Sequence, residues 1–244
     1  EQLVLRRRIE ARVGESRFAL RDQVENAGPT RASHMFLYHC NAGFPVVDES
    51  SELLVPSRAT TTDYGVPVEG YATMSAPVPG ATEACFEHEL IAEPEGTVPV
   101  ALVNRGLGLG VYQVFHISQL PHHTVWRMMG EGTYALAMEP STNRDAGRPD
   151  ARERGELQWL EPGEQRRYDL EIGALPGAAA IGEFETYDAH HDHTTLTEIG
   201  ADQVFHVHPE DPQTHEDVPQ DMAGAIGYAQ QQASQHAGSV QIDD

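Results

Sequence analysis

The sequence predicts an all-β protein whose antiparallel strands form a sandwich. Apolar and polar residues alternate with a period of two from residue 1 to about residue 187, as they do in strands that bury one face. Clusters of Gly, Pro and polar residues interrupt the alternation at short intervals. No helical period of adequate length occurs between them. Many short strands separated by turns favour a sandwich over an α/β fold.

The clearest strand lies near the end of this region. It places Tyr168, Leu170 and Ile172 on one face, while Arg167 and Glu171 lie on the other. This is the pattern of a half-buried antiparallel strand. Three earlier segments have either continuous or alternating apolar residues between turn clusters, which indicates strands as well. In chain order, the four predicted strands are 98–106, 110–119, 133–139 and 166–175.

The composition of the chain changes after Tyr187. The segment that follows is rich in His, Asp, Thr and Pro, and it contains one short apolar island at 204–207. It holds too little apolar surface to build a core of its own. We therefore expect a β-sandwich domain over 1–187 and an acidic, His-rich extension over 188–244 that is largely irregular.

The charge of the chain argues against one class of partner. Its 244 residues carry 38 acidic and 16 basic side chains, which gives a formal net charge of −22. A surface this acidic repels a phosphate backbone, so nucleic acid is not expected as a partner.

All of the basic residues are arginine, since the sequence contains no lysine. We consider two explanations, a halophilic cytoplasm with an acidic proteome and a GC-rich genome that favours arginine codons. Molar salt shortens the Debye length to about 3 Å, so a halophilic protein should gain stability in it. Melting curves from low to molar potassium chloride decide between them, because an unchanged melting temperature contradicts the halophilic origin.

Cysteine usage and hydropathy indicate the cellular compartment of the protein. Cys40 and Cys85 are the only cysteines and have dissimilar neighbours, which indicates neither a disulfide framework nor a cysteine-based metal site. No run approaches the roughly 20 apolar residues of a membrane span, and the first residues have no apolar signal core. We expect a cytoplasmic protein that makes no membrane contact.

Two polar positions interrupt the apolar pattern. His39 shares a strand face with Met35 and Leu37, so it is expected to be buried, and Asn41 adds a second polar group on that face. Glu139 ends a strand whose same-face neighbours are small alanines. Each of these residues can have a structural role, as a hydrogen-bonded core side chain or a turn cap. Each can instead have a functional role, as a group that lines a pocket.

Three short motifs resemble the aldose 1-epimerase superfamily, also known as galactose mutarotase-like proteins. LYHCNAGFPVVD resembles the region that carries the general acid, and YALAMEPSTNRDAGRPD resembles the region that carries the general base. LQWLEPGEQRRYDLEIGAL resembles the turn and final strand that follow. The order agrees with the superfamily. The nearest likeness is an uncharacterised branch with a Tyr-His-x-Asn-x-Gly-x-Pro motif, a Leu-Pro…Trp segment and a Glu-Pro-x-x-Asn motif, here Tyr38–Pro45, Leu120–Trp126 and Glu139–Asn143.

The resemblance implies a galactose mutarotase-like β-sandwich, or supersandwich, that interconverts the anomers of a monosaccharide or modified sugar. Glu139 takes the place of the base and His39 that of the acid, and no cofactor or metal is implied. Asn41 matches a supporting position in the pocket. The further candidate substrate contacts are Trp126, Arg127, Asn143 and Arg148, and other cleft candidates are Arg144, His116, His122 and His123.

The chain also departs from the superfamily. Only 38 residues precede His39, and none of them resembles the region that carries a further substrate-binding histidine. The sequence therefore resembles the C-terminal two thirds of a mutarotase-like domain, with the N-terminal part apparently absent. Two alternatives to the epimerase stay open: a non-catalytic carbohydrate-binding protein on the same fold, and an epimerase or isomerase that acts at another carbon or on a sugar phosphate.

The C-terminal extension suggests a metal site as a competing idea. Its imidazoles are the kind of ligand that zinc and nickel accept. The spacing matches no fixed zinc motif, so a compositional run in an acidic tail is the favoured interpretation. The histidines concerned are His190, His191, His193, His206 and His208.

Overall fold

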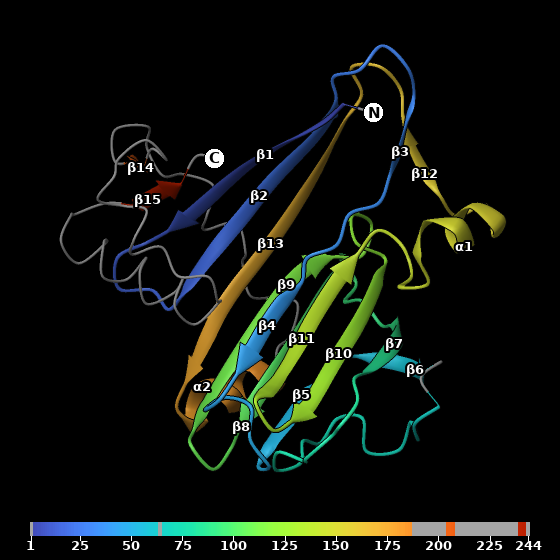
Figure 1. The fold of residues 1–244 in the computed structure, drawn as a ribbon. Helices are drawn as coiled ribbons and strands as arrows, with labels where there is room; N and C mark the ends of the chain where they lie inside the picture. The colour runs from blue at the N-terminus through green and yellow to red at the C-terminus, as the bar shows by residue number, and fades with distance from the viewer. Residues whose placement is uncertain (1, 63–64, 187–203, 208–238, 243–244) are drawn as a thin grey trace. The chain divides into compact units, whose positions relative to one another are not determined.

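The computed structural model describes residues 2–62, 65–186, 204–207 and 239–242. Nearly all regular structure in these residues is antiparallel β-sheet (Figure 1), which confirms the all-β prediction. The chain divides into two compact units. The first comprises the described parts of Glu1–His34, Gln158–Gly173 and His190–Asp244, and the second comprises those of Met35–Leu157 and Ala174–Ala189.

The first unit is built on three antiparallel strands. β2 (Arg17–Asn26) lies between β1 (Leu3–Ala11) and β13 (Gln165–Pro176), most of which belongs to this unit. Tyr168, Leu170 and Ile172 of β13 are buried, as their alternation predicts. The remaining strands of the unit are β3 (Ala32–His34), which pairs with β12 (Gln158–Leu160), and β15 (Ser239–Ile242), which pairs with β1 and, in parallel, with β14 (Val204–Val207).

The second unit contains two sheets. One has the strand order β4-β11-β10-β7-β6, and β9, β8 and β5 pair in a second. The bounds of the first sheet are β4 (Cys40–Gly43), β6 (Ser57–Thr61), β7 (Ala84–Leu90), β10 (His122–Gly130) and β11 (Thr133–Ser141). Those of the second are β5 (Ser51–Leu54), β8 (Thr97–Asn104) and β9 (Leu109–His116).

Side chains join the two sheets of this unit face to face. The amide of Gln113 on β9 donates to the carbonyl of Met138 on β11 at 3.2 Å. The ring of Phe115 on β9 stacks on that of His123 on β10, with centroids 5.9 Å apart. The core between the sheets includes Leu102, Leu136 and Met138, each fully buried. One face of the β11-containing sheet therefore packs against the second sheet and forms part of the core.

Two short helices were not expected from the sequence. α1 (Gly147–Glu153) occupies part of the charged stretch before β12, and α2 (Ala178–Glu185) follows β13. Each helix buries a single residue, Ala151 in α1 and Ile181 in α2. Two turns of helix are too short to display a repeating apolar stripe, so periodicity could not reveal them. Neither is long and apolar enough to cross a bilayer, and the same holds for every helix among the described residues.

The predicted boundary near residue 187 and most of the predicted irregular extension lie outside the described residues. Within the extension, β14 coincides with the apolar island that the sequence singled out. The proposed metal ligands His190, His191, His193 and His208 also lie outside the described residues, so the metal site stays a prediction.

Candidate active site

The register of the five-stranded sheet brings together polar residues that are distant in the sequence. Glu139 on β11 is directly opposite Thr124 on β10, and Thr124 is directly opposite Glu87 on β7. On the other side of β11, Ala137 is opposite Asn41. Because side chains alternate along strands, these residues all project from the face of the sheet that is turned away from the inter-sheet core. His39, two residues before Asn41, projects from the same face.

His39 and Glu139 are in contact. The imidazole Nε2 of His39 lies 3.0 Å from the carboxylate Oε1 of Glu139. Oε1 has no hydrogen-bond partner among the described residues, so this is a close polar contact and not an aligned hydrogen bond. Two segments separated by a hundred positions in the sequence thus place an acid and a base side by side.

His39 is more exposed than its sequence context predicts. Half of its side chain is open to solvent, against 4% of the Glu139 side chain. The prediction of a buried histidine was wrong because β4 is the edge strand of its sheet, so apolar neighbours in the sequence do not surround it in space. Leu37, on the same face, is exposed as well. An exposed imidazole can turn without disturbing the core.

Glu139 is the buried member of the pair. Burial and, to a lesser extent, the negative charge of Asp145 together raise its pKa from the ordinary 4.5 to about 7. A carboxylate surrounded by protein loses water that would stabilise its charge, and a like charge adds repulsion. The pKa therefore lies close to neutral pH, which is where a general base transfers protons most efficiently.

Trp126 and Asn41 lie beside this pair. The indole of Trp126 is 6.0 Å from the His39 ring, centroid to centroid, and tilted by 56°. Its N–H donates to the Glu83 carboxylate at 2.9 Å, which fixes the ring. Asn41 is exposed on the adjacent strand. Ala137, on the β11 strand between these two residues, is fully buried, so other atoms of the protein cover its methyl group.

Arg127 is not brought to this face. It follows Trp126 on β10 and therefore projects from the opposite side of the sheet. Its guanidinium donates to the carbonyls of Gly70, Tyr71 and Thr73 at 3.1 to 3.4 Å and lies over the ring of Phe86. Its expected role as a substrate contact is replaced by one in bracing a loop.

Asn143 also has a structural task. It is buried, and its amide donates to the carbonyl of Glu156 at 3.0 Å while its oxygen accepts from Thr142 at 2.9 Å. Arg148 lies exposed in α1. The hydrogen bonds of Asn143 are thus made to Thr142 and Glu156 and hold the chain after β11 in place.

The three histidines that the sequence suggested as cleft residues lie in different surroundings. His122 is on the Glu139 face, half-buried, and burial together with Arg144 lowers its pKa. His123 is in the core between the sheets, where burial lowers its pKa well below the ordinary value. His116 bonds the carbonyl of Glu95 at 2.8 Å and a neighbouring serine. Only His122 lies near the pair.

Sequence reasoning missed three acidic residues around the site. Glu83 holds Trp126, Glu87 binds Arg144, and Asp145 acts on Glu139. Only Glu87 carried a local signal, since it alternates with buried residues in β7. The others lie in connections whose path the strand pattern cannot predict. No three His, Cys, Asp or Glu side chains within the described ranges form a group that could hold a metal ion.

Comparison with solved structures defines the class to which this fold belongs. The chain matches the "putative aldose 1-epimerase" of Klebsiella pneumoniae with a TM-score of 0.67 and 24% identity, over 71% of this chain and 46% of that one. It also matches the galactose mutarotase related enzyme of Lactobacillus acidophilus with a TM-score of 0.50 and 12% identity, over 70% and 61%. The fold is therefore a galactose mutarotase-like β-sandwich. The chain spans about half the length of the Klebsiella protein.

The sequence itself assigns the family. Residues 1–174 match the family described as Domain of unknown function (DUF4432), and the chain belongs to it. No curated protein matches the sequence.

Proposed function

We propose that this protein is an aldose 1-epimerase-like enzyme, in which Glu139 is the general base and His39 the general acid. One observation carries the proposal, the 3.0 Å contact between the buried carboxylate of Glu139 and the half-exposed imidazole of His39 at the edge of the sheet. The name of the Klebsiella neighbour refers to the same reaction. Because folds host many functions, the chemistry of the pair supports the proposal more strongly than the likeness of fold.

The reaction needs two proton transfers at one carbon. Glu139 takes the proton of the anomeric hydroxyl while His39 gives a proton to the ring oxygen. The bond between the anomeric carbon and the ring oxygen breaks and a carbonyl forms. After rotation about the neighbouring carbon–carbon bond, the same steps in reverse close the ring as the other anomer, and both side chains regain their starting state. The anomeric hydroxyl oxygen and the ring oxygen are bonded to the same carbon. Glu139 and His39, which are in contact, can therefore reach these two oxygens after a small movement of the exposed His39.

The burial of the pair fits these roles. The base is held on a strand and shielded from water, whereas the acid is half exposed. The forward reaction requires an ionised Glu139, so the rate should rise with pH through about 7, where this carboxyl loses its proton. A base whose pKa is near the working pH is partly ionised at that pH and still has a high affinity for the proton that it must accept.

We also propose that the substrate is an uncharged aldose. Trp126 offers an aromatic surface beside His39 that suits the apolar face of a sugar ring. Arg144, the nearby cation best suited to meet a phosphate, is already paired with Glu87 at 3.0 Å and lies 3.9 Å from Glu156. An anionic sugar would have to compete with these carboxylates for the guanidinium.

Anomer exchange measured by NMR over a panel of free aldoses and sugar phosphates tests the proposal. We expect saturable acceleration with at least one free aldose and little with the corresponding phosphate. Exchange that stays at the buffer rate across the whole panel would overturn the enzymatic function, and acceleration confined to sugar phosphates would overturn the substrate assignment.

Replacing His39 by Gln should slow the exchange by about 100-fold or more, because an amide can hydrogen-bond to the ring oxygen but cannot give it a proton. The change is in kcat, since Gln retains much of the contact surface. Steady-state kinetics of both proteins on the same aldose give the comparison. A variant that keeps the wild-type kcat would show that another group protonates the ring oxygen.

A further inference from the structure

The rings of His39 and Trp126 approach each other across an intervening strand. Trp126 is on β10 and His39 comes just before β4, and β11 lies between these two strands. Backbones two strands apart in a sheet are separated by about 10 Å. The ring centroids of His39 and Trp126 are only 6.0 Å apart, so the two side chains lean toward each other over β11.

Small neighbours leave room for the indole of Trp126. In its row of the sheet, Trp126 is opposite Ala137 on β11 and opposite Cys85 on β7. Both of these neighbours are buried, whereas Trp126 is only half-buried. An indole placed between two short side chains can lie across the row, and packing alone does not decide which way its ring is turned.

A single hydrogen bond fixes the orientation of this ring. The indole N–H of Trp126 donates to Oε2 of Glu83 at 2.9 Å. An indole has one polar hydrogen and no acceptor, so this bond uses its whole hydrogen-bonding capacity. Because the acceptor is a carboxylate, the bond is also stronger than one between neutral groups. Glu83 therefore determines which edge of the ring is turned toward β7.

The main chain that carries Glu83 is anchored on both sides. Glu83 immediately precedes β7, whose first residue, Ala84, pairs with β10. Shortly before Glu83, the N–H of Val78 donates to the carbonyl of Met129 on β10 at 2.8 Å, and the N–H of Ala81 donates to the carbonyl of Val78 at 3.3 Å. The strand that bears the indole thus also holds the segment that presents its acceptor.

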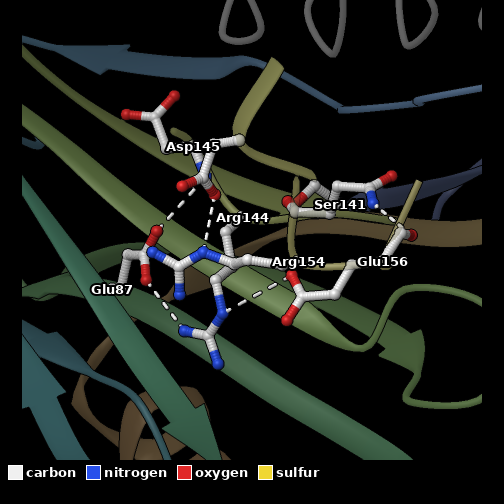
Figure 2. A network of polar contacts seen from close by, with 8 residues as sticks. Glu87, Ser141, Arg144, Asp145, Arg154 and Glu156 are labelled. Atoms are coloured by element: carbon white, nitrogen blue, oxygen red, sulfur yellow. Dashed lines mark hydrogen bonds and ion pairs between the residues drawn. The ribbon is translucent and has the colours of Figure 1, made fainter. Parts of the chain in front are cut away.

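The next carboxylate along this segment has a different task. Oε1 of Glu87 on β7 accepts the N–H of Asp145 at 3.2 Å, and Oε2 meets the guanidinium of Arg144 at 3.0 Å. Figure 2 shows Glu87 holding both residues at once. Glu87 therefore fixes the connection after β11, whereas Glu83 holds the indole.

We propose that Glu83 is a positioning residue for substrate binding, which holds the indole of Trp126 in the orientation that receives the apolar face of a sugar ring beside His39. The inference rests on the proposed function. Glu83 acts through Trp126 and does not touch the reacting atoms. An indole that turns freely has to be ordered when the sugar binds, and this lowers the affinity, whereas a ring held by Glu83 is ordered beforehand.

The first test compares two replacements of Glu83. Ala removes the acceptor of the indole N–H, so KM for a responsive aldose should rise about 5-fold while kcat stays within about twofold of the wild type. Gln keeps a side-chain oxygen that can accept the same N–H, so its KM should lie near that of the wild type. Glu89→Gln is the control for loss of an exposed charge, since the side chain of Glu89 is 63% exposed.

A wild-type KM in the Ala variant overturns the inference. An equal rise of KM in the Ala and Gln variants overturns it as well, because the charge of Glu83 and not its hydrogen bond would then be responsible. The background Trp126→Phe keeps an aromatic ring and removes the N–H. In this background Glu83→Ala should leave KM unchanged, and an effect that persists there contradicts action through the indole.

A measurement without substrate separates this inference from the proposed function. The chain contains two tryptophans, and Trp159→Phe identifies the indole N–H signal of Trp126 in ¹H–¹⁵N NMR spectra. In Glu83→Ala this signal should move upfield and its hydrogen should exchange faster with solvent, because the charged acceptor is lost. Glu83→Gln should retain the slow exchange. An unmoved signal in the Ala variant overturns the role of Glu83, whether or not the protein exchanges anomers.

The same signal also reports on sugar binding. Titration of the wild type and of Glu83→Ala with the aldose gives a Kd for each, which should differ by the same factor as KM. Equal Kd values overturn the positioning role alone. A weaker Kd in the Ala variant, together with anomer exchange at the buffer rate in the wild type, supports the role of Glu83 and overturns only the enzymatic function.

Discussion

Replacing Glu139 by Gln should abolish most of the anomer exchange, lowering kcat by about 10³-fold. The amide has the shape of the carboxyl group but cannot accept the proton of the anomeric hydroxyl. Binding should change little, because the hydrogen-bonding oxygen remains. NMR exchange spectroscopy with one responsive aldose, at several concentrations, separates the loss in kcat from any change in KM.

The same substitution should stabilise the protein above neutral pH. The folded-state pKa of Glu139, about 7, lies above the ordinary value of 4.5, so the folded protein binds more protons than the unfolded chain between these values. Stability is therefore lost as the pH rises from 4.5 to 7. Removing the charge of Glu139 should recover about 1 kcal/mol of the lost free energy of unfolding. The gain is only part of the loss because the contact with His39 and the solvent already reduce the cost of burying the charge. Activity and stability should thus change in opposite directions.

Urea denaturation at pH 5 and at pH 8 checks the second expectation. The difference between the variant and the wild type should be small at pH 5 and favour the variant at pH 8. Glu89→Gln serves as the control, because it removes an exposed charge from the same sheet. A Glu139 variant with wild-type exchange would rule out the proposed base, and one destabilised at pH 8 would show that His39 more than offsets the cost of burial.

Acid should unfold this protein through two buried histidines. His88 and His123 are directly opposite each other on β7 and β10, with ring centroids 5.6 Å apart. Both nitrogens of His123 and Nε2 of His88 have no hydrogen-bond partner among the described residues. Burial lowers the pKa of His88 to about 4, and burial together with His88 lowers that of His123 well below the ordinary value.

The sign of the effect follows from these directions. The unfolded chain takes up protons near pH 6.5 and the folded protein only at lower pH, so stability is complete above 6.5 and is lost as the pH falls toward 4. His88 alone accounts for about 3 kcal/mol of this loss, at 1.36 kcal/mol for each unit of pKa difference. This is a large share of the stability of an ordinary domain.

Two replacements of His123 separate its titration from its packing. Leu and Gln both abolish its protonation, so each should flatten the fall in stability between pH 6.5 and 4. At pH 7 the Leu variant should lie within about 1 kcal/mol of the wild type, because an unsatisfied polar ring is replaced by an apolar group. Denaturation midpoints across this pH range give the slopes. An undiminished slope in both variants would show that other groups control the acid transition.

The strand pattern predicted the fold because burial imposes it residue by residue. The alternation of Tyr168, Leu170 and Ile172 required one buried face, and all three are buried. The predicted strands at 98–106 and 110–119 correspond to β8 and β9. The helices α1 and α2 escaped prediction, since eight residues or fewer with one buried side chain carry no detectable period.

Pairing between strands decided what alternation alone could not. Trp126 and Arg127 are adjacent in the sequence, and both were plausible substrate contacts. The pairing of Trp126 with Ala137 places the indole on the Glu139 face and leaves the arginine on the other. Likewise His122 and His123 are neighbours with opposite surroundings, one beside Arg144 and the other beside Phe115. A shift of one residue in register would exchange all of these roles.

The sequence by itself determined the β class, the positions of the main strands and the candidacy of His39 and Glu139, because these depend on local alternation and on short motifs. Tertiary structure alone decided that the two side chains touch, that His39 is exposed while Glu139 is buried, and that the charge of Asp145 acts on Glu139. Those properties depend on which strand lies at the edge of the sheet and on the path of a connection, and both arise from contacts between residues far apart in the chain.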